Sequence, residues 1–221
     1  NGKEESDLSK ILPPLEYLSE FSRTEEYLVI ESQNNFPTSS GLASSASGIA
    51  SLVTAYEAHY DLCLDINDKV KACMLGSGSA PRSLIGGFVL MDHKDNFRCS
   101  QILKEPEWPL DVLICIVSKE PKEISSREGM EISKKTSPIY QDWLDVNDKH
   151  INLALNAIKD KDMAALEIVT EENCKLMHEV MKTSIPSISY MTDLTYSCLS
   201  EIENLRSLGH KLFYTIDAGP Q

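Results

Sequence analysis

The chain has 221 residues, 42% of them hydrophobic, which is enough to bury the core of one large or two small domains. Its 34 acidic residues outnumber 21 Lys and Arg, and the formal net charge of -13 argues against a nucleic-acid partner or an acidic-membrane surface. No stretch approaches the ~18 consecutive apolar residues of a membrane helix, and the first residues do not resemble a signal peptide. We therefore expect a cytoplasmic protein with no nucleic-acid and no membrane partner.

The first half is expected to alternate short elements with loops of small residues. Residues 1–20 are charged and carry leucines at helical spacing, which favours a short helix, and residues 27–32 are typical of a strand. The small-residue segment 34–48 runs into apolar positions at helical spacing, which predicts a loop that turns into a buried helix. A second such loop, residues 76–83, leads into a strand at 88–91.

The second half begins after a polar, proline-punctuated stretch near residues 105–109, where we place a domain boundary. Residues 112–117 are continuously apolar and predict a strand buried on both faces. Residues 119–137 are polar and predict a loop. Helical patterns and a final strand follow at 148–159, 161–182, 188–208 and 211–216, with Gly209 at the position of a helix-ending glycine. The pattern as a whole predicts an α+β protein of two layers.

Six cysteines are spread along the chain, mostly within apolar runs. They form neither a close-spaced disulfide framework nor a C-x-x-C metal motif, so we expect reduced thiols.

The loop before the first buried helix is suited to hold a phosphate group. Unpaired backbone N–H donors and the positive end of the helix dipole converge at a helix N-terminus, and small side chains let a phosphate approach. Gly41 can adopt unusual backbone angles, while Ser44 and Ser45 offer hydroxyls to a phosphate or a Mg²⁺ ion. The P-loop pattern with its lysine is absent. A helix that packs closely through Ala and Ser is the open alternative.

Residues 37–46, P-T-S-S-G-L-A-S-S-A, resemble the nucleotide-phosphate loop of the GHMP kinase superfamily. The longer stretch 34–48 resembles the version found in mevalonate diphosphate decarboxylases. The resemblance implies nucleotide binding by Pro37, Ser40, Gly41, Leu42, Ala43, Ser44, Ser45 and Ala46. It implies no certain metal ligand from the protein: Mg²⁺ arrives with ATP, and Ser44 or Ser45 is the candidate to contact it.

The second loop, residues 76–88, resembles the decarboxylase motif G-S-G-S-A-C-R-S-x-x-G-G-F. The resemblance implies that Ser77, Gly78 and Ser79 bind the substrate diphosphate. It also implies that Arg82 binds the substrate carboxylate and the catalytic Asp, a role that suits the planar guanidinium. From the residues alone, a solvated surface arginine is the alternative. Pro81 stands where the family typically has Cys, and since proline fixes φ and removes an N–H, it is expected to shift the loop slightly.

The last residues resemble the decarboxylase motif F-D-A-G-P-N or M-D-A-G-P-N, whose Asp is the family's catalytic carboxylate. The resemblance therefore implies Asp217 and Arg82 as the catalytic residues. Gln221 replaces the usual Asn. From the residues alone, Asp217 is an equally ordinary N-cap for a following helix.

The resemblance runs through the whole chain in colinear order. It implies a GHMP-kinase-like fold with a ribosomal-protein-S5-like N-terminal domain at 1–106, lacking its first strands, and a ferredoxin-like C-terminal domain at 107–221, truncated at its end. The implied reaction is ATP-dependent decarboxylation of mevalonate 5-diphosphate to isopentenyl diphosphate, with ADP, phosphate and CO₂ released, in the mevalonate pathway of isoprenoid and sterol biosynthesis. ATP and Mg²⁺ are the implied cofactors, mevalonate diphosphate is the small-molecule partner, and a homodimer is the implied assembly.

Three alternatives stay open. The chain is also compatible with a phosphomevalonate decarboxylase or with a mevalonate 3-kinase, although the presence of both Arg82 and Asp217 weighs against the pure kinase. A non-catalytic dimeric paralogue is the third, and only Pro81 and Gln221 support it.

His178 lies among acidic residues on a predicted helix. A metal site there is disfavoured because the second His of an H-E-x-x-H zinc helix is missing. A structural role is the favoured interpretation. The family resemblance adds that Asn173 and His178 are candidates to line the substrate site.

Overall fold

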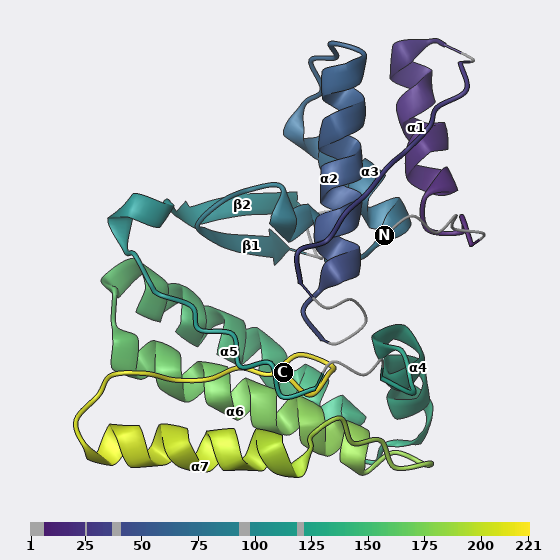
Figure 1. Cartoon of the computed structure of the whole chain (residues 1–221). Helices are drawn as coiled ribbons and strands as arrows, with labels where there is room; N and C mark the ends of the chain where they lie inside the picture. The colour runs from purple at the N-terminus through teal and green to yellow at the C-terminus, as the bar shows by residue number, and fades with distance from the viewer. Residues whose placement is uncertain (1–6, 25, 37–40, 93–97, 119–121) are drawn as a thin grey trace. The chain divides into compact units, whose positions relative to one another are not determined.

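The computed structural model describes residues 7–24, 26–36, 41–92, 98–118 and 122–221, which fall into two compact units. The first unit lies within residues 1–35 and 43–109, and the second within 36–42 and 110–221. Helices and an antiparallel strand pair occur together, which confirms the expected α+β class. Figure 1 shows the elements with their labels.

The first unit is built on three helices, α1 (Leu12–Ser22), α2 (Ser44–His59) and α3 (Ile66–Gly76). They enclose an apolar core in which Leu18, Val53 and Cys73 are fully buried. The predicted buried helix after the small-residue loop is confirmed as α2. The sequence analysis missed α3, whose start is fixed by the Asp65 carboxylate accepting hydrogen bonds from the first-turn amides.

Two strands complete this unit and pair antiparallel, β1 (Phe88–Asp92) and β2 (Arg98–Leu103), with Leu90 opposite Ser100. The predicted strand at 88–91 is confirmed as β1. Two short 3₁₀ turns flank the pair, η1 (Ala80–Ser83) and η2 (Glu105–Glu107).

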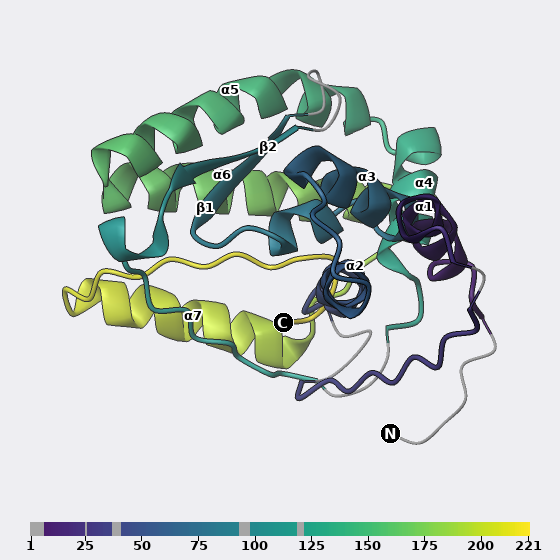
Figure 2. The ribbon, with the colours of Figure 1, turned by 90° about the horizontal axis from the view of Figure 1, so that it is seen from above.

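The second unit contains α4 (Ser126–Thr136), α5 (Tyr140–Asp160), α6 (Met163–Lys182) and α7 (Asp193–Ser207). Figures 1 and 2 both show α5, α6 and α7 side by side, with the extended run 211–216 lying along α6 and α7. Near the start of α7, a cluster of Met181, Ile188, Tyr190 and Ala218 is buried.

Helix ends in the second unit follow from their caps. The Asp162 carboxylate accepts hydrogen bonds from the first-turn amides of α6, close to the predicted start at 161. The predicted start of α7 at residue 188 is wrong, because the Thr192 hydroxyl caps the helix and Ile188 is instead a buried residue of the preceding segment. Gly209 has φ +92°, which confirms its helix-ending role.

Three predicted strands are wrong within the described residues. Residues 27–32, 112–117 and 211–216 have no ladder partner there, and the only described sheet is the β1–β2 pair. Val112 and Leu113 expose 84% and 88% of their surface, contrary to a strand buried on both faces. Apolar composition alone does not make a strand, because a strand needs a neighbour to satisfy its backbone groups.

Part of the polar loop predicted at 119–137 is also wrong, since residues 126–136 form α4. The Ser125 hydroxyl accepts the Glu128 amide at 3.2 Å and starts this helix. The helix has only two large apolar residues, Met130 and Ile132, and this polar composition led to the loop prediction.

Candidate functional site

Asp217 is exposed, although both of its neighbours are buried: Ile216 is 6% and Ala218 is 4% exposed. Its carboxylate accepts the Ala218 amide at 2.8 Å, and its carbonyl accepts the Gly219 amide at 2.7 Å. Asp217 therefore heads a tight turn through Gly219, rather than capping a helix within the described residues. The Asp217 carboxylate is therefore exposed, while the residues before and after it are held in place by burial.

Three side chains hold the turn after Asp217, two from other segments and one from the turn's own last residue. The Thr195 hydroxyl at the start of α7 donates to the Pro220 carbonyl at 2.9 Å, and the Lys122 ammonium donates to the Ala218 carbonyl at 2.6 Å. The Gln221 carboxamide oxygen accepts the Val117 amide at 2.7 Å. Gln221 thus joins the turn to the extended run at 110–118.

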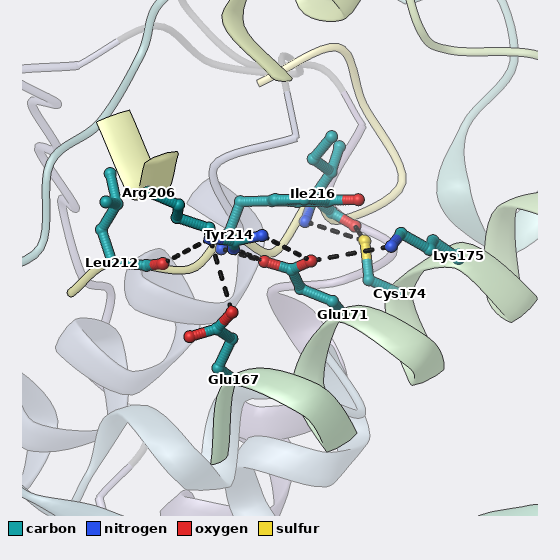
Figure 3. A network of polar contacts seen from close by, with 8 residues as sticks. All are labelled: Glu167, Glu171, Cys174, Lys175, Arg206, Leu212, Tyr214 and Ile216. Carbon is teal, nitrogen blue, oxygen red and sulfur yellow. Dashed lines mark hydrogen bonds and ion pairs between the residues drawn. The ribbon is translucent and has the colours of Figure 1, made fainter. Parts of the chain in front are cut away.

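The run that leads to Asp217 is bound through its backbone to side chains of α6 and α7. Figure 3 shows Glu171, Cys174 and Lys175 of α6 facing Tyr214 and Ile216. Glu171 is 6% exposed, and its carboxylate accepts hydrogen bonds from the Arg206 guanidinium and, at 3.3 Å, from the Tyr214 amide. This hydrogen-bonded carboxylate raises the pKa of Arg206.

Arg206 reaches further along the same run. Its Nε donates to the Leu212 carbonyl at 2.9 Å and lies 3.4 Å from the Glu167 carboxylate. Lys175 Nζ lies 3.6 Å from the Glu171 carboxylate. The acidic and basic side chains of α6 and α7 therefore form ion pairs with one another where they bind the backbone of the run.

Ile216, one residue before Asp217, has both backbone groups bound by α6. Its amide donates to the Cys174 sulfur at 3.2 Å, and its carbonyl accepts from His178 Nε2 at 3.1 Å and from the Cys174 thiol at 3.5 Å. Burial raises the pKa of the Cys174 thiol, so the thiol keeps its proton and can donate it. Burial lowers the pKa of His178, while the Ile216 carbonyl and the Asp217 charge act in the opposite sense.

Gly41 belongs to the same unit as Asp217, and the two loops meet there. Gly41 has φ +96°, and a Cβ added to it would lie 2.8 Å from the Gly219 backbone Cα. Only glycine allows both that backbone angle and that approach. Of the predicted nucleotide-binding residues, Pro37 and Ser40 lie outside the described residues, and Leu42 follows Gly41 half-buried.

The rest of the predicted nucleotide loop forms the start of α2 in the first unit. Ala43 takes φ +50°, and neither a side-chain cap nor an acidic side chain occupies the first turn. Ser44 is half-buried, Ser45 is exposed, and Ala46 is buried. This helix start therefore has small residues and no negative charge of its own, as an anion site requires.

The second predicted loop lies between α3 and β1 of the first unit. Ser77 is buried with its hydroxyl 3.5 Å from that of Ser79, and Gly78 between them is exposed. Arg82 projects from η1 and is exposed. The structure thus brings the four predicted substrate-binding residues onto one short loop, within the unit that does not contain Asp217.

Two family models match the chain. The model of the diphosphomevalonate decarboxylase-like N-terminal domain matches residues 1–101, and that of the mevalonate 5-diphosphate decarboxylase C-terminal domain matches residues 112–221. A solved mevalonate diphosphate decarboxylase from Staphylococcus aureus is 31% identical with a TM-score of 0.84, over 99% of this chain and 67% of that one. The chain belongs to the mevalonate diphosphate decarboxylase family.

Other members of the family give the same picture. The diphosphomevalonate decarboxylase of Candida albicans is 34% identical over 224 residues, covering 97% of this chain and 62% of the relative. The Ganoderma lucidum enzyme is 37% identical over 86% of this chain and 51% of its own length. The present chain thus spans between about half and three-fifths of these two relatives.

The decarboxylase-family motifs depart from their usual pattern at Pro81 and Gln221, and both residues fit locally. Pro81 is buried at the second position of η1, where the missing N–H takes no hydrogen bond away from the turn. Its carbonyl still accepts the Leu84 amide at 3.2 Å. The loop therefore accommodates Pro81 without the loss of a backbone hydrogen bond within η1.

The sequence analysis missed the supporting residues of this decarboxylase-family site. Cys174 was interpreted only as a reduced thiol, Glu171 only as one of the acidic residues of the disfavoured metal site, and Arg206 was given no role. Their signal was the helical spacing of Glu171, Cys174 and His178, which places all three on one face of α6. The favoured structural role of His178 is confirmed by its hydrogen bond to Ile216.

A separate hollow of about 900 Å³ lies in the first unit, lined in part by Tyr17, Asp68, Lys71 and Arg98. None of the predicted site residues lines it, and no family motif includes it. Among the described residues, no helix is long and apolar enough to cross a membrane.

Proposed function

We propose that the protein containing this chain catalyses the ATP-dependent decarboxylation of mevalonate 5-diphosphate to isopentenyl diphosphate, with release of ADP, phosphate and CO₂. The observation that carries the proposal is the carboxylate of Asp217, exposed on a backbone clamped on both sides, within the matched C-terminal domain of the family. A solved relative at 31% identity is described as a complex with MVAPP, AMPPCP and magnesium. That description supports a nucleotide and a divalent cation as the partners of this site.

In the proposed reaction, Asp217 accepts or orients the proton of the substrate's tertiary 3-hydroxyl as its oxygen attacks the γ-phosphorus of ATP. ADP leaves, and the 3-phosphate departs as the bond to the carboxylate breaks. The electron pair of that bond becomes the new C=C bond, and CO₂ is released. Since the reacting groups are all anionic, we assign Arg82, with its planar set of donors, to the substrate carboxylate.

The nucleotide is assigned to the loop before α2 and to the first turn of that helix. A phosphate group fits a helix start that has neither a side-chain cap nor an acidic side chain. Gly41 has no side chain, and a Cβ there would clash with the Gly219 backbone. Ser44 and Ser45 provide hydroxyl oxygens that fit a Mg²⁺ ion carried by the nucleotide. When bound, Mg²⁺ neutralises charge on the phosphates, as in other phosphoryl transfers.

We propose further that Ser77, Gly78 and Ser79 bind the substrate diphosphate. We also propose that the protein is a cytoplasmic homodimer, in which the two units are the two domains of each subunit. The loop geometry of Ser77 and Ser79 supports the first assignment. The six free cysteines support a reducing compartment. Sedimentation of the full-length protein tests the dimer.

The test uses the full-length protein with ATP, Mg²⁺ and carboxyl-labelled mevalonate, its 5-phosphate or its 5-diphosphate, and measures CO₂ and ADP together. Equal amounts of CO₂ and ADP from the diphosphate alone are expected. CO₂ from the monophosphate instead identifies a phosphomevalonate decarboxylase, ADP without CO₂ identifies a kinase, and the absence of both identifies a non-catalytic paralogue. Each of these three results overturns the proposal.

A further inference from the structure

We propose that His178 of α6 is a positioning residue that, together with Cys174, sets the place of the Asp217 carboxylate by binding the backbone of Ile216. The inference rests on the proposed function, since it gives Asp217 its catalytic role. It assigns His178 a part in the reaction without contact to the reacting atoms.

The geometry begins with the two residues lying one helical turn apart. Cys174 and His178 are four residues apart on α6, so their side chains project from the same face. Together they bind both the amide and the carbonyl of Ile216, at 3.1–3.5 Å. Ile216 is covalently joined to Asp217, so a shift of its carbonyl moves the carboxylate directly.

These bonds replace the strand partner that the run 211–216 lacks within the described residues. A buried backbone amide or carbonyl without a partner is strongly disfavoured, and Ile216 is only 6% exposed. The usual solution would be a neighbouring strand. Here, α6 side chains satisfy the backbone one residue before the carboxylate, and Glu171 does the same for the Tyr214 amide.

Histidine is suited to this position because of which nitrogen bonds the carbonyl. A carbonyl oxygen only accepts, so the Nε2 of His178 carries the proton that is donated to Ile216. The length of the side chain matters as well, because the donor is the distal nitrogen of the ring. The side-chain amide nitrogen of Gln can reach the same position, whereas that of Asn is too short. This difference supplies a matched pair of substitutions.

The experiment compares His178→Gln with His178→Asn in the full-length protein, both polar amides that differ by one methylene. Steady-state kcat and the KM values for ATP and substrate are measured, with the melting temperature of each variant. We expect His178→Gln to keep kcat within about threefold of the parent. His178→Asn is expected to lose about 10- to 100-fold in kcat with little change in either KM, because displacements of about 1 Å at a reacting group have such effects.

The matched control is His210→Gln, at an exposed histidine directly before the same run, for which kcat is expected to be unchanged. Equal kcat for parent, His178→Gln and His178→Asn overturns the positioning role. Equal losses in the two His178 variants overturn it as well, since the donor would then not matter. A parent protein that releases no CO₂ overturns the proposed function instead, so the two failures are distinguishable.

Discussion

At the scale of single residues, the backbone of Gly41 constrains the proposed site most tightly. Gly41 has a φ of +96° and approaches Gly219 closely. The unusual backbone angle could be predicted from the sequence, because a glycine in a phosphate-type loop indicates one. The identity of the neighbour could not. A contact across nearly the full length of the chain depends on the tertiary fold and leaves no local signal.

Gly41→Ala is expected to lower kcat by at least about tenfold, because the added methyl would lie 2.8 Å from Gly219 and push the two loops apart. The matched control is Gly48→Ala within α2, where an added Cβ meets no atom within 4 Å. That change should raise helix stability by about 1 kcal/mol and leave kcat unaltered. Steady-state kinetics and thermal melting of both variants check this, and equal kcat values would contradict the contact.

His178 is expected to make stability depend on pH. Burial lowers its pKa in the folded state, so the unfolded chain takes up this proton more readily as the pH falls through about 6.5. The contribution of the neutral His178 ring to the free energy of unfolding is therefore complete above that pH and is lost progressively below it. Urea unfolding at pH 5.5 and 7.5 should show a larger loss for the parent than for His178→Gln, and the same pH dependence in both would contradict the burial of a neutral ring.

At the scale of elements, helices were predicted better than strands. The helix α2 and the body of α6 followed from apolar spacing, and β1 followed from its composition. The runs 112–117 and 211–216 are as apolar as strands, but what decides a strand is a hydrogen-bonding neighbour, and composition does not report one. The backbone of the second run is bound instead by Glu171, Cys174 and His178. Their spacing predicts that they share one face of α6, but the sequence does not show which segment they bind.

Glu171→Ala is expected to lower the free energy of unfolding by about 3 kcal/mol, because it leaves the Arg206 guanidinium and the Tyr214 amide without their shared acceptor. Glu179→Ala on the same helix is the control. Its carboxylate lies 3.8 Å from Lys182 on an exposed face, and such pairs contribute less than about 1 kcal/mol. Chemical denaturation measures both, and comparable losses would show that the Glu171 network does not hold the run.

At the scale of the whole molecule, the α+β class and the family followed from the sequence because three motifs stand in the same order as in the family. Individual motif residues were also foreseeable from that order. The support beneath Asp217 was not, since it is built from α6, α7 and the run 110–118, which carry no motif of their own. Motifs mark the groups that react, whereas the residues that hold those groups follow from packing.

The catalytic role of Asp217, which lies in the second unit, is the remaining prediction at this scale. Asp217→Asn in the full-length protein tests the central claim most directly, because it removes the charge and the proton acceptor while keeping the shape of the turn. Single-turnover CO₂ release is expected to fall by about a thousandfold, with the substrate dissociation constant changed by less than about tenfold. CO₂ release within a few-fold of the parent rate would contradict the assignment of Asp217 as the catalytic carboxylate.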